Sequence, residues 1–458
     1  MISRIDDISQ EIDFRSPTVA LHTLGCRLNQ YETEAIRERF VARGFQVVPF
    51  TEKADVYVVN TCTVTNKADS RARQVLRRAV RLAPDATIVA TGCYAQTNAE
   101  ELLNIEGVDL VLGNAEKGDL VDIVLSREHA SSPKSYVTRR SEIRTFDDRL
   151  DVTAFENRTR ATLKIQDGCD QFCSFCIIPW ARGRHRSRPL KDILKQAKTF
   201  LDSGYKEIVL SGVHLGEYGS DLKDSIDLIQ VIEHILSIPE LPRLRLSSIW
   251  PTDVTDDLIR LMQQHAPRFC RYLHLAVQHG DNEILRSMKR TYTIEETSSL
   301  LEKLTKKVPD ICIGADIMVG FPGETDSHFQ RMVDFLDRSP FAYFHVFTYS
   351  RRDHTRAAQM PNQVDLKAAQ ERSREIRALS ERKTHDYNAR FKETQVEVLA
   401  EERNANGQLI GRTDRFMKVE WVGEDHSINS FVTLKVEDTD HQGASGVLCT
   451  PEIGKKFL

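Results

Sequence analysis

The chain has 458 residues, of which 40% are hydrophobic and 28% charged, an ordinary globular composition that suggests about two to four domains. Its formal net charge is -4, which excludes a global positive field, so any contact with nucleic acid has to come from local patches. The 9 cysteines indicate reduced thiols and metal chemistry rather than a disulfide framework, and with neither a signal peptide nor a membrane-length apolar run we expect a cytoplasmic protein with no membrane contact.

The first part of the chain alternates between strand and helix signals. Apolar runs predict strands over residues 18–24, 56–60 and 87–91. Helices are predicted over 31–40 and through the arginine-rich segment after Cys62. Strand, loop and helix repeated in this order predict a parallel α/β sheet, and we assign this domain to residues 18–130.

A cysteine follows each of these strands: Cys26, Cys62 and Cys93. The carboxyl ends of parallel strands share one edge of the sheet, where ligands bind, so the three thiols could meet in space. The alternative is three buried structural cysteines, since free cysteine is often a core residue. Three cysteines at the same topological position favour a ligand set.

A linker and a second α/β domain follow. Residues 131–156 are polar and start with Ser131, Ser132 and Pro133, which is typical of a loop. Strand signals then recur at 161–165, 207–211, 243–247, 272–276, 313–318 and 343–347. Six strand–helix units are too few for an eight-stranded barrel, so residues 157–390 predict a partial, laterally open one.

The loop after the first of these strands carries Cys169, Cys173 and Cys176 in a C-x3-C-x2-C spacing. Three thiolates at this spacing can converge on one face of an iron–sulfur cluster, whereas an ordinary electron-transfer [4Fe-4S] cluster takes four cysteines. One iron would then stay open for a substrate or cofactor. The alternatives are a zinc site with His185 as fourth ligand, or three structural thiols.

The last part of the chain changes character. A charged helix is predicted over about 365–392. Residues 394–399, 416–422 and 431–436 then alternate at the strand period, with glycines between them. This pattern predicts a small β-barrel over residues 391–453.

Together these motifs resemble a known family. The triplet with Phe175 before its last cysteine is similar to the signature of radical S-adenosylmethionine (SAM) enzymes. The stretches around Cys26 (TLGCRLNQYETE), Cys62 (VNTCTVT) and Cys93 (TGCYAQ) resemble the amino-terminal domain of methylthiotransferases. The resemblance implies an α/β protein with an amino-terminal parallel sheet, a central partial (β/α)6 radical SAM barrel and a carboxy-terminal TRAM-like RNA-binding barrel.

The resemblance also implies two [4Fe-4S] clusters and SAM as cofactors. The cluster on Cys169, Cys173 and Cys176 would cleave SAM to a radical. The cluster on Cys26, Cys62 and Cys93 would hold the sulfur to be transferred. An external electron donor and a sulfur donor are implied as partners.

Two stretches, 24–33 and 212–219, are most similar to the branch that methylthiolates N6-threonylcarbamoyladenosine at position 37 of tRNA, in the anticodon loop. The nearest alternatives act on isopentenyladenosine-37 of tRNA or on an aspartate of a ribosomal protein. An alternative of a different class is a non-catalytic iron–sulfur protein that binds RNA.

Further contacts are expected at the strand ends and in basic stretches. Ser211 and Gly212 stand where family members bind the methionine amino group of SAM, although Gly212 could equally be a plain turn. Phe175 occupies the usual aromatic position of the signature, and Gln278 ends another strand at the same edge, so both are further candidate SAM contacts. Consecutive positive charges at Arg182, Arg184 and Arg186 suggest contacts with RNA phosphates or with a cofactor carboxylate, and the alternative is a solvated loop. In the small β-barrel, Arg412 and Lys418 lie close together in sequence near Phe416 and are further candidate RNA contacts. Tyr94 and Trp180 are candidate stackers for unpaired bases.

The chain departs from the family pattern at three positions. His279 stands where serine is common, His354 where glycine is usual and Arg356 where proline is common. Because a glycine replaced by histidine loses easy access to positive φ, we expect a changed loop around residue 354.

Overall fold

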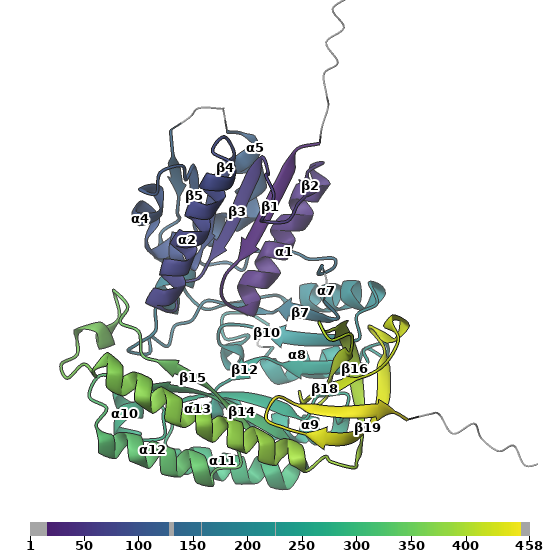
Figure 1. The fold of residues 1–458 in the computed structure, drawn as a ribbon. Helices are drawn as coiled ribbons and strands as arrows, with labels where there is room; N and C mark the ends of the chain where they lie inside the picture. The colour runs from purple at the N-terminus through teal and green to yellow at the C-terminus, as the bar shows by residue number, and fades with distance from the viewer. Residues whose placement is uncertain (1–15, 128–131, 157, 225, 450–458) are drawn as a thin grey trace, which may run out of the picture.

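The computed structural model describes residues 16–127, 132–156, 158–224 and 226–449. A parallel-sheet domain, purple and blue in Figure 1, lies on a larger teal and green domain, and a small yellow β-barrel packs against one side of the latter. The predicted α/β fold class and its three-part architecture are confirmed. Parts of the predicted segments lie outside the described residues. They are residues 1–15 of the polar leader, residues 128–130 of the first domain, residue 131 of the linker, residue 157 of the second domain and residues 450–453 of the small barrel.

Six parallel strands form the first sheet, in the order β2-β1-β3-β4-β5-β6. Their bounds are β1 Thr18–Thr23, β2 Gln46–Val47, β3 Val56–Thr61, β4 Thr87–Gly92, β5 Leu110–Leu112 and β6 Lys134–Tyr136. The central strand β3 is buried throughout, as expected where helices cover both faces of a parallel sheet.

The helices of this domain are α1 Arg27–Ala42, α2 Asn66–Leu82, α3 Cys93–Thr97, α4 Ala99–Leu103 and α5 Leu120–Leu125. α1 begins directly after Cys26, four residues before the predicted start. α2 begins after Thr65, whose side chain accepts a hydrogen bond from the amide of Ala68 and so caps the helix.

The predicted linker 131–156 is corrected in two respects. β6 lies within it and pairs with β5, although its three residues are exposed and show no apolar alternation that would predict a strand. Farther along, Leu150, Val152 and Phe155 are buried in the core that the two large domains share. The connection is therefore packed between the domains.

The larger domain contains a six-unit partial barrel in chain order. β7 Arg160–Lys164, β10 Glu207–Ser211 and β11 Arg243–Leu246 form one sheet. β12 Ser248–Ile249 follows β11 after a single residue and joins β13 Tyr272–Gln278, β14 Cys312–Val319 and β15 Tyr343–Thr348. The predicted open barrel with six strand positions is confirmed.

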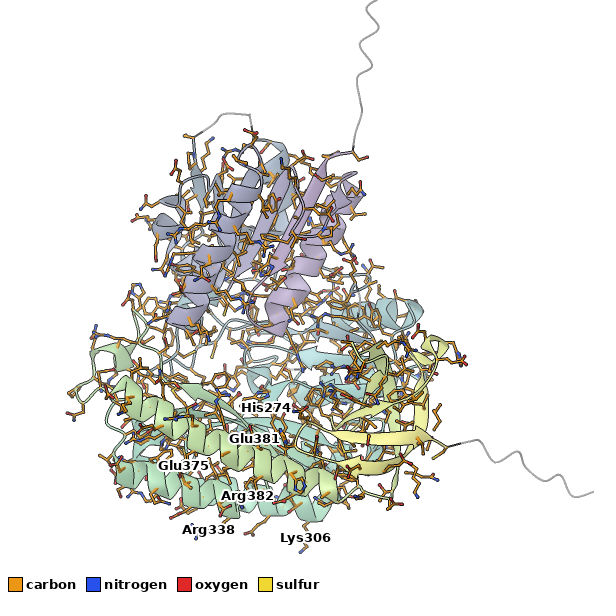
Figure 2. All side chains as sticks on the ribbon, in the orientation of Figure 1. His274, Lys306, Arg338, Glu375, Glu381 and Arg382 are labelled. Carbon is orange, nitrogen blue, oxygen red and sulfur yellow. The ribbon has the colours of Figure 1, made fainter. Side chains whose placement is uncertain are left out.

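Helices cover the outside of this barrel. They are α7 Leu190–Asp202, α8 Leu228–Leu236, α9 Asp256–His265, α10 Asn282–Ser287, α11 Ile294–Lys307, α12 Asp326–Arg338 and α13 Leu366–Ala389. The short helix α6 Ile178–Arg182 lies instead against α3 of the amino-terminal domain. Lys306, Arg338 and Arg382 project from their outer faces (Figure 2). No helix in the described part of the chain is both long and apolar enough to cross a membrane.

The carboxy-terminal strands close into a barrel in the order β16-β17-β18-β20-β19. They are β16 Gln395–Arg403, β17 Leu409–Thr413, β18 Lys418–Trp421, β19 Phe431–Thr439 and β20 Ala444–Leu448. The sequence pattern did not predict β17 and β20, which are short and contain Gly411 and Gly446.

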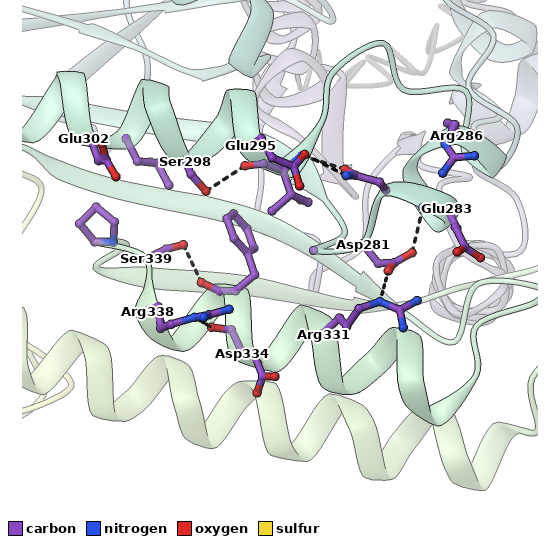
Figure 3. A pocket seen from close by; sticks show the side chains of 16 residues that line it. Asp281, Glu283, Arg286, Glu295, Ser298, Glu302, Arg331, Asp334, Arg338 and Ser339 are labelled. Carbon is purple, nitrogen blue, oxygen red and sulfur yellow. Dashed lines mark hydrogen bonds and ion pairs between the residues drawn. The ribbon is translucent and has the colours of Figure 1, made fainter.

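A cavity of about 760 Å³ lies on the outer side of the larger domain, between α11 and α12 (Figure 3). Charged residues line it, among them Asp281, Arg286, Glu295, Arg331 and Asp334. None of the cysteines or predicted contact residues lies on its walls, so the candidate site is elsewhere.

Candidate active site at the junction of the two large domains

Three cysteines lie at one edge of the amino-terminal sheet. Cys26 follows β1 and immediately precedes α1, Cys62 follows β3, and Cys93 is the first residue of α3, directly after β4. β1, β3 and β4 are neighbours in the sheet. The sheet topology therefore brings these residues together from positions far apart in the sequence.

The three thiols affect one another. Burial, together with neighbouring Cys93 and Cys26, raises the pKa of the Cys62 thiol to about 12. Cys62 and Cys93 are buried, whereas Cys26 is exposed. Gly25 lets the loops approach closely, because a Cβ at this position, where φ is +100°, would lie 2.7 Å from the Cβ of Cys62.

The second cysteine loop lies at the mouth of the barrel. The antiparallel strands β8 Gln166–Asp167 and β9 Arg186–Ser187 close its base. Ser174 attaches the loop to the end of α10, since its amide donates to the carbonyl of Met288 at 3.1 Å and its hydroxyl to that of Ser287 at 2.8 Å. The loop is therefore fixed from two sides.

The thiols of this loop also affect one another. Burial, together with neighbouring Cys173, raises the pKa of the Cys176 thiol to about 12. Beside the loop, Nε2 of His214 bonds to the carboxylate of Asp253 at 2.9 Å, and the carboxylate of Glu217 lies 3.5 Å from its Nδ1. Burial alone would lower the pKa of His214, but these carboxylates raise it.

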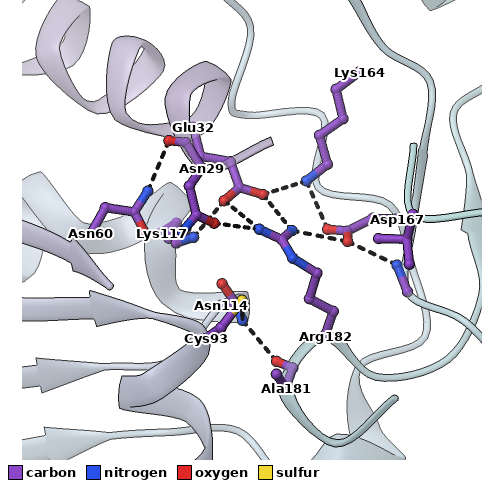
Figure 4. A network of polar contacts seen from close by, with 12 residues as sticks. Asn29, Glu32, Asn60, Cys93, Asn114, Lys117, Lys164, Asp167, Ala181 and Arg182 are labelled. Carbon is purple, nitrogen blue, oxygen red and sulfur yellow. Dashed lines mark hydrogen bonds and ion pairs between the residues drawn. The ribbon is translucent and has the colours of Figure 1, made fainter. Parts of the chain in front are cut away.

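A buried ionic network connects the two cysteine loops (Figure 4). Arg182, at the end of α6, bonds to Glu32 of α1 at 2.8 Å, to Asp167 at 3.0 Å and to the side-chain oxygen of Asn29 at 2.6 Å. Lys164 bridges the same two carboxylates, at 2.7 Å from each. The network thus joins the start of α1, next to Cys26, to the base of the barrel loop.

Positive charge exceeds negative charge in this network. Glu32 and Asp167 are the carboxylates, whereas the cations are Lys117, Lys164, Arg182 and Arg186. Burial raises the pKa of the Cys93 thiol, and Arg182 and Lys117 act in the opposite direction. A thiolate ligand set fits these surroundings, because buried charges require charges of opposite sign nearby.

This geometry corrects two predicted RNA contacts. Arg182 is 1% exposed and Arg186 4% exposed, and both bond within the protein, so neither is available to a phosphate. Arg184 differs, because its side chain is 70% exposed and its nearest carboxylate, that of Asp170, lies 3.9 Å away. An RNA contact by Arg184 stays a prediction.

The predicted SAM contacts lie at the barrel mouth. Ser211 is the last residue of β10, and Gly212 follows it against the side chain of Gln166. Gln278 is the last residue of β13 and has φ of +69°. Phe175 packs beside Cys173 and Cys176. The structure thus gathers these residues near the cysteine loop, while their contacts with SAM stay predictions.

An exposed aromatic group lies beside the barrel loop. Phe172 is 36% exposed, and its ring and that of Trp180 lie beneath the guanidinium of Arg140, at 5.3 and 4.4 Å. His354 packs on Trp180 at 5.2 Å. Tyr94, the other predicted stacker, is fully buried and bonds to Arg73, so it cannot stack on a base.

The departures from the family pattern have structural counterparts. His279 is fully buried and pairs with Glu324 at 3.2 Å, which connects the end of β13 to the loop after β14. His354 has φ of +66°, so the left-handed backbone that a glycine would favour is kept. Arg356 is the first residue of a short 3₁₀ helix, Arg356–Gln359.

The basic residues of the small barrel have partners within the protein, so their RNA contacts stay predictions. Arg412 packs on Phe416 at 4.4 Å, and its carbonyl accepts from Arg243 at 3.1 Å. It therefore lies between the two barrels. Lys418 is half-buried and pairs with Glu420. Neither side chain forms a free basic patch.

One polar cluster carried no signal in the sequence pattern. His274 of β13 bonds to Asp316 of β14 at 2.9 Å, and His345 of β15 lies 3.7 Å from the same carboxylate. The other ring nitrogen of His274 contacts the hydroxyl of Tyr343 at 2.9 Å. These residues are separated by many positions, and only strand register places them together. Internal hydrogen bonds account for the arrangement.

Sequence comparisons match both large domains. Residues 18–113 match an uncharacterized protein family, UPF0004, and residues 163–336 match the radical SAM superfamily. The first match contains Cys26, Cys62 and Cys93, and the second contains Cys169, Cys173 and Cys176.

Named relatives cover nearly the whole chain. A threonylcarbamoyladenosine tRNA methylthiotransferase MtaB of Bacillus subtilis is 41% identical over 92% of this chain and 93% of its own length. The protein of the same name from Thermotoga maritima is 35% identical, with 93% and 96% covered. A tRNA-2-methylthio-N(6)-dimethylallyladenosine synthase of Thermotoga petrophila is 32% identical, with 91% and 94% covered.

Among solved structures, the radical SAM methyltransferase TsrM from Kitasatospora setae is similar in fold. Its TM-score is 0.54 at 19% identity, over 75% of this chain and 77% of that one. At this identity the similarity concerns architecture alone.

Proposed function

This chain belongs to the radical SAM methylthiotransferase family, and on that premise we propose that it transfers a methylthio group to C2 of N6-threonylcarbamoyladenosine at position 37 of tRNA. The observation that carries the proposal is a pair of three-cysteine sets held at one domain junction by a shared ionic network. The finer choice of substrate is supported by the relatives, because those 35–41% identical include proteins named for threonylcarbamoyladenosine, whereas a dimethylallyladenosine synthase is 32% identical.

We propose that each cysteine set holds one [4Fe-4S] cluster. Bound SAM and iron–sulfur clusters would supply the radical and the methyl group, chemistry that side chains cannot provide. Cys169, Cys173 and Cys176 would hold the cluster that cleaves SAM, and the other three cysteines would hold the sulfur. Arg182 bonds to Glu32 and Asp167 and so keeps the two loops at a fixed separation.

The tRNA would lie across α2 and the exposed aromatic group. Lys67, Arg71, Arg78 and Arg81 share one stripe of α2, because their spacing corresponds to whole helical turns. All four are exposed, and within the described residues no carboxylate lies within 4 Å of them. α2 starts just after Cys62, so phosphates bound here would bring an anticodon loop to the junction.

Nucleoside analysis of tRNA tests the proposed function. Cells lacking the gene should lose the 2-methylthio form of N6-threonylcarbamoyladenosine and regain it with the wild-type gene. A variant with all of Cys26, Cys62 and Cys93 replaced by alanine should fail to restore it. Loss of methylthiolated isopentenyladenosine instead would favour the alternative substrate, and no change in any tRNA nucleoside would exclude the tRNA assignment.

Iron content tests the two-cluster proposal separately. Anaerobically reconstituted protein should bind about eight irons per chain, four for each cluster. Replacing Cys169, Cys173 and Cys176 should remove half of the iron and abolish production of 5′-deoxyadenosine from SAM. Replacing the other three cysteines should also remove half of the iron while production of 5′-deoxyadenosine continues.

The proposed reaction also needs an external reductant and a sulfur donor. We propose that it takes place in the cytoplasm, where tRNA is modified.

A further inference from the structure

Arg290 is a buried cation without a counter-charge. It is 7% exposed, and its Nε and Nη1 atoms have no hydrogen-bond partner among the residues that the structure describes. Within the same residues, no carboxylate oxygen lies within 4 Å of its guanidinium. A guanidinium remains charged in proteins, and an uncompensated buried charge is costly. Its surroundings therefore require an anion.

The backbone fixes Arg290 next to the barrel cysteine loop. α10 ends at Ser287, and Lys289 follows with φ of +60°. The amide of Arg290 donates to the carbonyl of Leu285 at 2.9 Å, and that of Lys289 to the carbonyl of Arg286 at 3.0 Å. This is the Schellman arrangement that ends helices. Two carbonyls of this turn also accept the hydrogen bonds that Ser174 donates. The same turn therefore holds both the cysteine loop and Arg290 in place.

Aromatic rings hold the guanidinium in place. Its central carbon lies 3.8 Å from the ring centre of Trp250, 5.8 Å from that of Tyr292 and 5.9 Å from that of Phe175. Trp250 and Tyr292 belong to the apolar cluster that contains Cys173, and Cys176 packs against this cluster. The rings exclude water and orient the cation, but they carry no full negative charge.

We propose that Arg290 is the counter-cation of the iron–sulfur cluster that Cys169, Cys173 and Cys176 would hold. This inference rests on the proposed function, because it takes these three cysteines as ligands. Three thiolates give the bound cluster net negative charge, and reduction adds one electron from the external donor. A fixed cation stabilises the reduced cluster more than the oxidised one and thereby makes its reduction potential less negative. Arg290 acts as a positioning and charge-compensating residue and takes no part in bond breaking.

Redox titration of the cluster tests this role. The background is the full chain with Cys26, Cys62 and Cys93 replaced by alanine, so that only the barrel cluster contributes to the electron paramagnetic resonance signal. Arg290→Gln removes the charge, and Arg290→Lys keeps it. Arg286→Gln, which replaces an exposed arginine of α10 four residues before Arg290, is the matched control. We expect Arg290→Gln to shift the midpoint potential to more negative values, Arg290→Lys to keep most of the original potential, and Arg286→Gln to leave it unchanged.

The dissociation constant of SAM, measured on the same proteins, distinguishes the cluster from the other available anion. If Arg290→Gln leaves the potential unchanged and weakens SAM binding by roughly tenfold or more, as loss of a charge-assisted hydrogen bond would, the guanidinium binds the SAM carboxylate and the cluster assignment is overturned. An equally large potential shift in Arg290→Lys would also overturn it, since charge would then not be the cause. If Arg290→Gln does not fold, the lysine variant decides alone: a potential near that of the unsubstituted background supports the proposal, and a large negative shift contradicts it. Full iron in a variant lacking Cys169, Cys173 and Cys176 would instead show that the proposed ligand assignment has failed.

Discussion

At the scale of single residues, the closeness of the amino-terminal cysteine loops depends on Gly25. Its φ of +100° is a conformation that side chains rarely adopt, and its neighbours leave no room for a Cβ. Gly44, at the end of α1, has a similar φ of +83° but no atom within 4 Å of the position of a Cβ. A side chain at either glycine would strain the backbone, but only one at Gly25 would also contact Cys62. Comparing substitutions at the two positions therefore isolates the effect of that contact.

We predict that Gly25→Ala lowers the bound iron from about eight to about four per chain, whereas Gly44→Ala leaves the iron content unchanged. The reason is that the new methyl group displaces Cys62 and with it the ligand set of the amino-terminal domain. Iron analysis after anaerobic reconstitution measures the difference. Equal iron in the two variants would show that the contact with Cys62 is unimportant.

Glu32 is the carboxylate on which the ionic network depends. Burial alone would raise the pKa of Glu32, but Arg182, Lys117 and Lys164 hold it well below its ordinary value. We predict that Glu32→Gln lowers the free energy of unfolding by about 3–5 kcal/mol, the usual cost of removing one partner from a buried pair. Chemical denaturation measures this loss. Glu34→Gln, which removes a half-buried pair with Arg37 on the same helix, should cost about 0.5 kcal/mol or less.

The pH dependence of stability follows from the same shift. Because the pKa of Glu32 is depressed in the folded protein, its stabilising contribution is fully present above the ordinary value of about 4.3 and is lost as the pH falls through the folded value. The stability of the wild type should therefore fall more steeply than that of Glu32→Gln below about pH 4. Parallel curves for the two proteins would contradict the depressed pKa.

Residue identity predicted some of this site and could not predict the rest. The cysteine spacings and the glycines before Cys26, Cys93 and Cys169 are local in sequence, so the sequence was enough to predict them. Arg182 looked like an RNA contact because its neighbours Arg184 and Arg186 are also basic. Its real partner, Glu32, is 150 residues away, and only the folded chain brings the two together.

At the scale of elements, strands with apolar runs were predictable and edge strands were not. β3 and β4 are nearly fully buried, so their sequences are continuous apolar runs. β6 is an exposed strand at the sheet edge, and backbone pairing with β5 rather than side-chain burial holds it there. β17 contains Gly411, whose missing side chain accommodates the neighbouring strand.

α2 carries the prediction that belongs to this scale. Arg71→Gln combined with Arg78→Gln should weaken tRNA binding and reduce the slope of log affinity against log salt by up to about two, because each lost phosphate contact removes about one unit. Iron content and SAM cleavage should stay unchanged. The matched control combines Arg39→Gln on α1 with Arg43→Gln at its C-cap, because both side chains pair with Asp122. An unchanged salt slope in the α2 variant would exclude this helix from the tRNA surface.

At the scale of the whole molecule, the sequence predicted which domains the chain contains but not how the small barrel packs against the larger one. The small barrel resembles an RNA-binding module in pattern, yet the end of β17 and the loop after it pack against the base of the larger barrel. Arg245 donates to the carbonyls of Thr413 and Asp414, at 3.1 and 3.0 Å, and Arg271 pairs with the carboxylate of Asp414 at 2.6 Å. Such contacts leave no signature in either segment alone, because each consists of ordinary arginines, carbonyls and a carboxylate.

The shared core of the two barrels determines what truncation of the chain should do. Tyr272, Cys270 and Cys312 of the larger domain belong to the same apolar cluster as Trp421 and Val419 of the small barrel. A chain that ends before Thr394 would expose this cluster and leave two fully buried arginines, Arg243 and Arg245, without their carbonyl partners.

We therefore predict that a chain ending before Thr394 is less soluble, melts at a lower temperature and binds less iron than the full chain. The physical cause is that the small barrel closes the base of the larger one, on which the cysteine loop depends. Melting temperature, iron per chain and tRNA affinity at two salt concentrations should be measured together, with Lys418→Gln in the full chain as a control that removes one basic side chain and leaves the docking contacts in place. A truncated protein with full iron and an unchanged melting temperature, but with weak and salt-insensitive tRNA binding, would show instead that the module serves to grip RNA.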